Sequence, residues 1–301
     1  MAGAFTAVDL SKLPFPDVVE TLDYEALLAQ MLADLRERAP AFDALVESDP
    51  AYKILEVAAF REMLLRQRVN EAAKAVMLAY AEDTDLDQIA ANYNVERLLI
   101  EPADPSTVPP TEAVYESDAD LRRRVQLAYE GFSTAGPAGA YYFHALGADS
   151  DVRDVGVYGP PTDPGTVHVA VLSRTGNGQA PTDLVQKVQA TLSAEDIRPL
   201  SDTVICKSAQ ILEYEIRAVL TFYNGPDAQV VLQAALAAVT AYTEQQHRIG
   251  RDVTLSGIYA ALHQEGVQNV ALLSPAANVV AEWDQAAYCT GITLTPGGSN
   301  G

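Results

Sequence analysis

One stretch of the sequence has glycines at the spacing of a phosphate-binding loop. In GFSTAGPAGA, Gly131 and Gly136 correspond to the outer glycines of such a loop. Pro137 and Ala138 stand where phosphate binding needs a lysine and metal binding needs a serine or threonine. We therefore interpret this stretch as a turn that begins a helix, and we predict no cofactor there.

Three aspartates imitate the start of a calcium-binding loop. Asp83, Asp85 and Asp87 have the spacing of its first three ligands. The sixth position, which requires glycine, is Gln88, and the twelfth, which requires a bidentate glutamate, is Asn94. Helix capping explains these acids better, so we predict no metal site.

The remaining candidates for catalysis do not form a recognisable site. The sequence has no HExxH or GxSxG motif, and neither cysteine lies in a known nucleophile context. Acidic residues are so frequent that any two can imitate a glycosidase pair. We therefore predict that the protein is not an enzyme and has no catalytic, cofactor-binding or metal-binding residues. The four histidines, which we expect to be packed or exposed, are His144, His168, His247 and His263.

The composition excludes several classes of partner. The chain of 301 residues carries a formal net charge of −21, which repels the phosphates of nucleic acids and anionic lipid surfaces. The N-terminus lacks the features of a signal peptide, and no uncharged run is long enough to span a membrane. Cys206 and Cys289 stand outside any CxxC motif, which indicates buried thiols in a reducing compartment. We expect neither nucleic acid nor a membrane as a partner.

The rest of the chain is organised around a predicted long helix from Ala51 to Glu82. Asp49 is a favourable N-cap, Pro50 suits the first helical position, and no glycine or proline interrupts the run. At about 1.5 Å per residue the helix would span roughly 48 Å, well beyond an average helix. Steps of three and four residues along it give an apolar seam broken only by Glu62. The candidate interface residues on this seam are Leu55, Ala58, Leu65, Val69, Ala72, Val76 and Ala79.

Two interpretations of this seam stay open on periodicity alone. The helix could lie within a large core of its own chain, or it could form a bundle with other chains. The apolar spacing of a single sequence is the same in both cases.

Composition divides the chain into five segments. We expect an extended arm and a first amphipathic helix in 1–48, the long helix and a proline-rich linker in 49–115, and a flexible tail in 291–301. Alternating short strands and helices indicate two small α/β modules, at 116–207 and 208–290. Each module is predicted to be a small sheet with helices on one face, so the predicted fold class is α+β.

The two modules share turn signals that suggest a duplicated unit. In each, an Asn-Gly pair precedes a helix, and an arginine and an aspartate four residues apart follow it. We interpret Arg198 with Asp202, and Arg248 with Asp252, as structural pairs that tie a helix end to the next strand, rather than as interface residues. Coincidence between two turn signals is the alternative to duplication.

A basic cluster stands out in this acidic chain. Arg122, Arg123 and Arg124 follow each other in a predicted helix. We interpret them as a solvated helix face that pairs with nearby carboxylates such as those of Asp118 and Asp120, rather than as a docking site for an acidic partner.

Several segments of the sequence resemble one known family. Together they run from about Asp9 to Cys289, in order and without a large gap. The chain resembles the baseplate assembly protein J family of contractile-tailed phages and of related phage-tail-like bacteriocins, or tailocins. The segments that carry the resemblance are RQRVNEAAKAVMLAYAEDTDLDQIA, PADPSTVPP, ESDADLRRRVQ, GFSTAGPAGAYYFHA, LSRTGNG, EDIRPLSDTV and HRIGRDVTLSGIYAALHQEGVQ.

This resemblance implies a structural and mechanical role. Proteins of this family form the inner wedge of the baseplate, in which two copies associate with one copy of a second, I-type wedge protein. Six such units ring the central hub and spike. The long helix would then enter a heterotrimeric bundle, which favours the bundled interpretation of the seam. The α/β modules would contact neighbouring wedges, and shifts between wedges would trigger contraction of the sheath.

The resemblance also implies partners and a location. The expected partners are further copies of the chain, the second wedge protein, the sheath initiator and the central hub or spike. The protein would lie in the baseplate of a virion or tailocin after assembly in the cytoplasm of the bacterial host. A tail-associated cell-wall hydrolase is the alternative function, and the missing catalytic motifs count against it.

Overall fold

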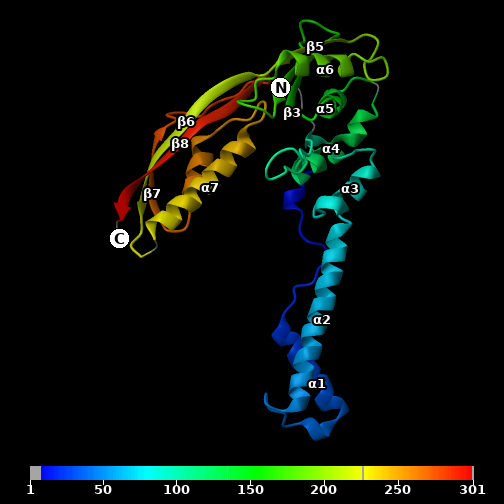
Figure 1. Cartoon of the computed structure of the whole chain (residues 1–301), viewed down its shortest axis with the longest axis vertical. Helices are drawn as coiled ribbons and strands as arrows, with labels where there is room; N and C mark the ends of the chain where they lie inside the picture. The colour runs from blue at the N-terminus through cyan, green and yellow to red at the C-terminus, as the bar shows by residue number, and fades with distance from the viewer. Residues whose placement is uncertain (1–7, 134, 226, 300–301) are drawn as a thin grey trace. The chain divides into compact units, whose positions relative to one another are not determined.

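The computed structural model describes residues 8–133, 135–225 and 227–299, in two compact units. The helical unit draws on Ala7–Arg97 and Ser117–Val125, and the sheet unit draws on Leu98–Glu116 and Gln126–Gly301. Helices dominate the first unit, and two separate three-stranded sheets dominate the second (Figure 1). The fold class is α+β, which confirms the prediction.

A helical hairpin forms most of the helical unit. The carboxylate of Asp23 caps helix α1 (Tyr24–Arg38) by accepting hydrogen bonds from two backbone N–H groups of the first turn. A 3-10 turn at Pro40–Phe42 follows, and α2 (Pro50–Ala75) then begins on Pro50, because proline is favoured at the first helical position. Helices α1 and α2 pack against each other (Figure 1).

The N-terminal arm, which contains one 3-10 turn at Leu10–Lys12, lies along α2. The buried side-chain amide of Asn70 accepts from the N–H of Glu20 at 3.0 Å and donates to the carbonyl of the same residue at 2.9 Å. The Tyr80 hydroxyl donates to a carbonyl of the arm at 2.8 Å, and its ring stacks on Phe15 with 4.7 Å between centroids. Because Asn70 binds both backbone groups of one residue, it sets the register of the arm on the helix.

The long helix ends at Ala75, before its predicted end. A turn follows, and α3 (Asp83–Ala91) restarts the helical path. The guanidinium of Arg122 donates to the carbonyl of Leu78 at 2.7 Å and to that of Ala81 at 2.6 Å. Arg122 thus supplies donors to two carbonyls of the turn that follows α2. This tertiary contact stabilises the end of α2 in a segment whose helix propensity would favour a longer helix.

The arginine cluster is therefore not the solvated face that the sequence suggested. It lies on α4 (Asp118–Gly131), and Arg124 is buried. One nitrogen of the Arg124 guanidinium donates to the carbonyl of Glu96 at 2.9 Å. The run of charges predicted exposure, whereas backbone carbonyls that need donors hold Arg122 and Arg124 inside the unit.

An ion-pair network surrounds the start of α3. Arg97 pairs with Asp87 and with Asp118, each at 2.7 Å. The N–H of Asp83 also donates to the Asp118 carboxylate at 3.1 Å. Burial opposes ionisation of Asp118, but these donors outweigh it and hold its pKa below the ordinary value. Of the acids that imitate a calcium loop, Asp87 thus joins a structural network through its carboxylate and Asp83 through its backbone N–H.

The proline-rich linker contains a short antiparallel hairpin. Strands β1 (Leu99–Glu101) and β2 (Val114–Tyr115) pair with each other, and a bridge between Asp104 and Thr111 lies nearer the tip. The Asp104 carboxylate accepts from the N–H of Ser106 at 2.8 Å and from its hydroxyl at 2.6 Å. These local bonds give the linker a defined path despite its prolines.

The first module of the sheet unit is a three-stranded sheet with two helices against it. Strand β4 is central, antiparallel to β3 and parallel to β5. Helices α5 and α6 contact each other and the sheet, as predicted, and Tyr141, Val169 and Leu192 belong to the shared core. The elements are α5 (Ala138–Gly147), β3 (Val152–Tyr158), β4 (Thr166–Ser173), α6 (Thr182–Leu192) and β5 (Thr203–Ser208).

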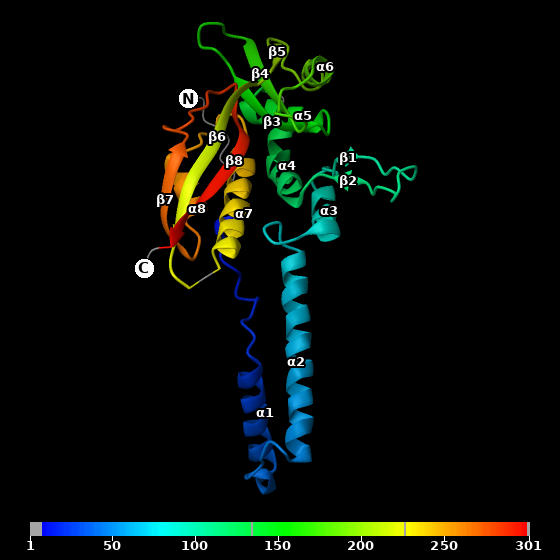
Figure 2. The ribbon, with the colours of Figure 1, turned by 60° about the vertical axis from the view of Figure 1, so that its left-hand side comes forward.

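The second module has the same design but a different connectivity. Strand β6 is central, antiparallel to β7 and parallel to β8, and α7 and α8 pack together beside it (Figure 2). The antiparallel neighbour follows the central strand here, whereas it precedes the central strand in the first module. The strand order therefore does not support simple duplication. The elements are β6 (Gln210–Phe222), α7 (Ala228–Gln246), α8 (Leu255–Leu262), β7 (Val267–Ser274) and β8 (Gln285–Ser299).

The flexible tail predicted for 291–301 is wrong as far as the structure describes it. Strand β8 continues to Ser299 and pairs with β6 along its length. Ile292 and Leu294 pack against the core of the second module. The glycines of this segment indicated a tail, but β6 supplies the backbone partners from far away in the sequence. Residues 300–301 lie outside the described part.

Polar contacts join the two modules. The buried Asp154 carboxylate accepts from the Tyr142 hydroxyl and, at 3.0 Å, from the N–H of Ile249. Within the second module, buried His247, just after α7, forms a hydrogen bond of 2.8 Å between its Nδ1 and the carbonyl of Ala287 in β8. Burial lowers the pKa of His247, although the carbonyl of Ala287 opposes this shift.

We expect acid to destabilise the sheet unit through His247. Its ordinary pKa is 6.5, so the unfolded chain takes up this proton at a higher pH than the folded protein does. The free energy of unfolding therefore falls as the pH drops through 6.5. Urea unfolding at stepwise pH values measures this slope, and His247→Gln should flatten it. Equal slopes for the two proteins would contradict the assignment.

Replacing Arg122 should destabilise the helical unit. Arg122→Ala removes two charge-assisted hydrogen bonds to backbone carbonyls, so we expect a loss of about 2 kcal/mol in the free energy of unfolding. The matched control is Arg68→Ala. The Arg68 side chain is 80% exposed, and its guanidinium forms a salt bridge with Glu71 at the long distance of 3.5 Å. That change should cost less than about 0.5 kcal/mol. Urea titration followed by circular dichroism compares the two, and equal losses would refute the capping role.

Candidate assembly interface

Helix α2 presents apolar side chains on two opposite faces. One face contacts α1 and the arm, and it contains Ala59 and Asn70, both buried. The other face leaves large apolar side chains exposed at spacings of three, four and seven residues. We call this set the α2 stripe; it consists of Ile54, Val57, Phe60, Leu64, Leu65, Val69 and Val76.

The predicted seam coincides with one side of the α2 stripe. Leu65, Val69, Ala72 and Val76 are exposed, with exposed fractions of 69%, 59% and 75% for Leu65, Val69 and Val76. Leu55, Ala58 and Ala79 are half-buried, and Ala79 lies beyond the end of the helix. Within the described residues, the outer part of the seam is therefore not covered by its own chain.

Sequence reasoning missed the other side of the stripe. Ile54, Val57 and Leu64 fall outside a strict heptad register, because an ideal helix has 3.6 residues per turn and drifts against a period of 3.5. Counting with the helical period would have shown an apolar face wider than a two-position seam. A wide face is suited to contact with more than one partner helix.

Helix α2 is basic in an otherwise acidic chain. Although the net charge of the whole chain is −21, α2 carries more basic than acidic side chains. Arg66 is held by Glu62 at 2.7 Å and by Glu20 at 3.0 Å. A partner helix with acidic flanks would complement this surface. The basic residues are Lys53, Arg61, Arg66, Arg68 and Lys74, and the acidic residues are Glu56, Glu62 and Glu71.

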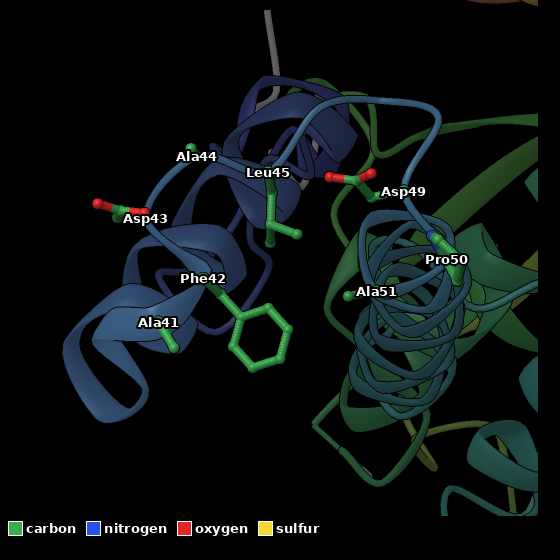
Figure 3. Close-up of a pocket in the computed structure, with 8 residues that line it drawn as sticks. All are labelled: Ala41, Phe42, Asp43, Ala44, Leu45, Asp49, Pro50 and Ala51. Atoms are coloured by element: carbon green, nitrogen blue, oxygen red, sulfur yellow. The ribbon is translucent and has the colours of Figure 1, made fainter.

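A hollow of about 470 Å³ lies at the turn of the helical hairpin. Figure 3 shows Phe42 and Leu45 on the turn and Pro50 at the start of α2. The Asp49 carboxylate accepts from the N–H of Val46 at 2.9 Å, which closes the turn. The hollow is lined mainly by apolar groups, so it suits an apolar side chain of a partner better than a charged ligand. Its lining is Ala41, Phe42, Asp43, Ala44, Leu45, Asp49, Pro50 and Ala51.

The two predicted structural turns differ in the hydrogen bonds of their aspartates. Arg198 donates to the backbone carbonyl of Asp202 at 2.7 Å, so these two residues lie together in a local turn. The Asp252 carboxylate instead accepts from the N–H of Ala281 at 2.9 Å, which ties its turn to the segment before β8. Arg248 is half-buried in the turn after α7.

The described residues offer no second site with obvious chemistry. Among them, no group of three histidine, cysteine or acidic side chains could hold a metal ion. No helix in the same residues has the length and apolar character needed to cross a membrane. Cys206 and Cys289 are half-buried, and burial raises the pKa of the Cys206 thiol to about 12. These thiols are protonated at neutral pH and are poor nucleophiles.

Three domain families match this chain in order. The Baseplate J-like N-terminal domain matches residues 47–104, the central domain matches 133–208, and the C-terminal domain matches 214–295. A curated relative, "Baseplate protein J" of Escherichia phage P2, is 50% identical over 300 residues, which cover 97% of this chain and 99% of the relative.

A solved structure also shows some likeness. It is a chain of the cryo-EM structure of the anti-feeding prophage (AFP) baseplate, 6-fold symmetrised, with 15% identity and a TM-score of 0.41. The likeness covers 60% of this chain and 43% of that chain.

Introducing a negative charge into the α2 stripe should leave the stability of the isolated chain almost unchanged. Leu65→Asp changes a side chain that is already 69% exposed, so we expect the free energy of unfolding to change by less than about 0.5 kcal/mol. Ala59→Asp, on the covered face of the same helix, buries a carboxylate and should cost about 3 kcal/mol or more. Urea unfolding of both variants checks this, and a large loss for Leu65→Asp would show that the stripe is covered within the chain.

Proposed function

This chain belongs to the Baseplate J-like protein family and is a structural component of a contractile-tail baseplate; we propose that it is an inner wedge protein. In the proposed arrangement, two copies associate with one copy of a second, I-type wedge protein. Six such units ring the central hub and spike. The single observation that carries the proposal is the exposed α2 stripe.

The α2 stripe supports a bundle because burial of these side chains is favourable. A Val, Leu, Ile or Phe side chain contributes about 1.5–3 kcal/mol when it leaves water completely. Burial of the seven side chains of the α2 stripe therefore offsets a substantial part of the free-energy cost of association. A two-helix contact covers only a narrow seam, whereas a three-helix bundle covers the wider face of α2.

The excess of basic residues on α2 indicates which kind of partner helix would complement it. Two copies of α2 would bring two helices with an excess of basic residues together, which costs energy unless acidic groups lie between them. We propose that the second wedge protein supplies a helix with acidic flanks. A heterotrimer then satisfies both the apolar stripe and its charges, which two copies alone do not.

The rest of the molecule supports a mechanical role. Arg122 and the Arg97 network fix the end of α2 within the helical unit. In the sheet unit, Asp154 ties the first module to the second, and His247 ties the end of α7 to β8. Rigid bodies of this kind transmit displacement without losing their own structure. We propose that shifts between wedges are passed on in this way and release the sheath.

The remaining partners and the location follow from the same proposal. They are the sheath initiator and the hub or spike, in the baseplate of a virion or tailocin assembled in the host cytoplasm. No feature of the described residues favours the alternative of a cell-wall hydrolase over this structural role.

Co-expression with the second wedge protein tests the proposal. We expect a complex of two copies with one partner, measured by light scattering. Val69→Asp should weaken it roughly 100-fold, because the bundle would bury an unpaired carboxylate. The matched control is Val230→Asp, which changes a valine of similar exposure on α7 and should leave the complex intact. A complex that survives Val69→Asp, or a chain that stays monomeric with every partner, would overturn the bundle.

A further inference from the structure

The sheet of the first module has protected edges. At β5, the N–H of Cys206 donates to the side-chain oxygen of Gln189 at 2.7 Å, and the amide nitrogen of Gln189 donates to the carbonyl of Val204 at 2.8 Å. The side-chain amide thus occupies the place that a peptide group of another strand would take. At the opposite edge strand, β3, Arg153 and Asp154 are engaged with the second module: Arg153 pairs with Glu244 at 2.9 Å, and Asp154 accepts from the N–H of Ile249.

The sheet of the second module lacks this protection. The N–H of Gly250 donates to the carbonyl of Gln285 at 2.9 Å, so the first residues of β8 are covered by the turn after α7. Among the described residues, the backbone from Tyr288 to Thr295 bonds to no element other than β6. The same is true of Gln268–Leu273 in β7. Neither β7 nor β8 contains a charged residue.

The free edges of β7 and β8 complement each other. Because β7 is antiparallel to β6 and β8 is parallel to it, β7 and β8 run in opposite directions. A second copy in the same orientation would therefore place its β7 antiparallel beside β8 of the first. Pro296, which cannot donate a hydrogen bond, ends the free stretch of β8, and the part from Tyr288 to Thr295 is as long as β7.

We propose that the second module is a strand-addition site for another copy of this chain, in which the free edge of β8 pairs with β7 of its neighbour. This contact is head-to-tail, so each copy uses both edges and repetition forms a ring or an open filament. A strand from a different protein that paired with β8 would leave the edge of β7 without a hydrogen-bonding partner. The proposal deepens the proposed function, because it names the contact between neighbouring α/β modules.

Charge favours a second copy as the occupant. Two chains of net charge −21 repel each other wherever charged surfaces meet. The exposed side chains along the free stretches of the two edge strands are uncharged, namely Thr290, Thr293 and Thr295 on β8 and Asn269, Ala271 and Leu273 on β7. This pairing therefore brings no like charges together across the strands, and threonines pack well in cross-strand pairs.

Cross-linking of single-cysteine chains tests the proposal. In full-length protein with Cys206→Ala and Cys289→Ala, one preparation carries Thr293→Cys and a second carries Ala271→Cys. A short bis-maleimide, which tolerates small differences in register, should link the two preparations when they are mixed. Thr240→Cys on the exposed side of α7 is the control and should not link to Ala271→Cys. Absence of the mixed product would overturn the proposal, and self-linking of Thr293→Cys would replace it by a symmetric β8 pair.

Two further variants separate this contact from the helix bundle. Adding Leu65→Asp to both preparations should remove bundle formation and leave the cross-link unchanged. Adding Thr295→Lys to the Thr293→Cys chain should reduce the cross-link, because lysine on an edge strand disfavours pairing, while Thr240→Lys should not. If the cross-link disappears with Leu65→Asp, the strand pairing depends on the bundle and is not a contact of its own.

Discussion

The structure depends on one constraint: α2 is apolar on two faces, and the described residues of its own chain cover only one of them. Helix α1 and the N-terminal arm use the face of Ala59 and Asn70, so the α2 stripe stays in water. Hydrophobic burial is the main favourable term in both folding and association. The same term that folds the hairpin would therefore favour the bundle that we propose for this face.

Side-chain groups define where the elements of this protein stop. Arg122 supplies donors to the turn after α2, Asn70 holds the arm, and Gln189 closes the edge of β5. Each satisfies backbone groups that a longer helix or another strand would otherwise satisfy. Among the described residues, the α2 stripe and the free edges of β7 and β8 lack such closure. These are the surfaces that we propose other chains complete.

Sequence reasoning succeeded where local signals mark the start of an element. It failed where a residue that is distant in the sequence determines the end or the course of the element. The proline at Pro50 predicted the start of α2 correctly. The end of α2 depends on Arg122, and the course of β8 depends on β6, so neither could be read from neighbouring residues. Steps of three and four found Leu65 and Val69 but missed the other side of the stripe.

The helical unit is discontinuous in the sequence, and this has a consequence for synthesis on the ribosome. Residues up to Arg97 emerge first, but the donors to Leu78 and Ala81 belong to Arg122. Until that arginine leaves the exit tunnel, the nascent chain is free to continue α2 past Ala75, as its local propensity favours. The boundary between α2 and α3 is therefore set late in translation, when α4 becomes available to the unit that precedes it.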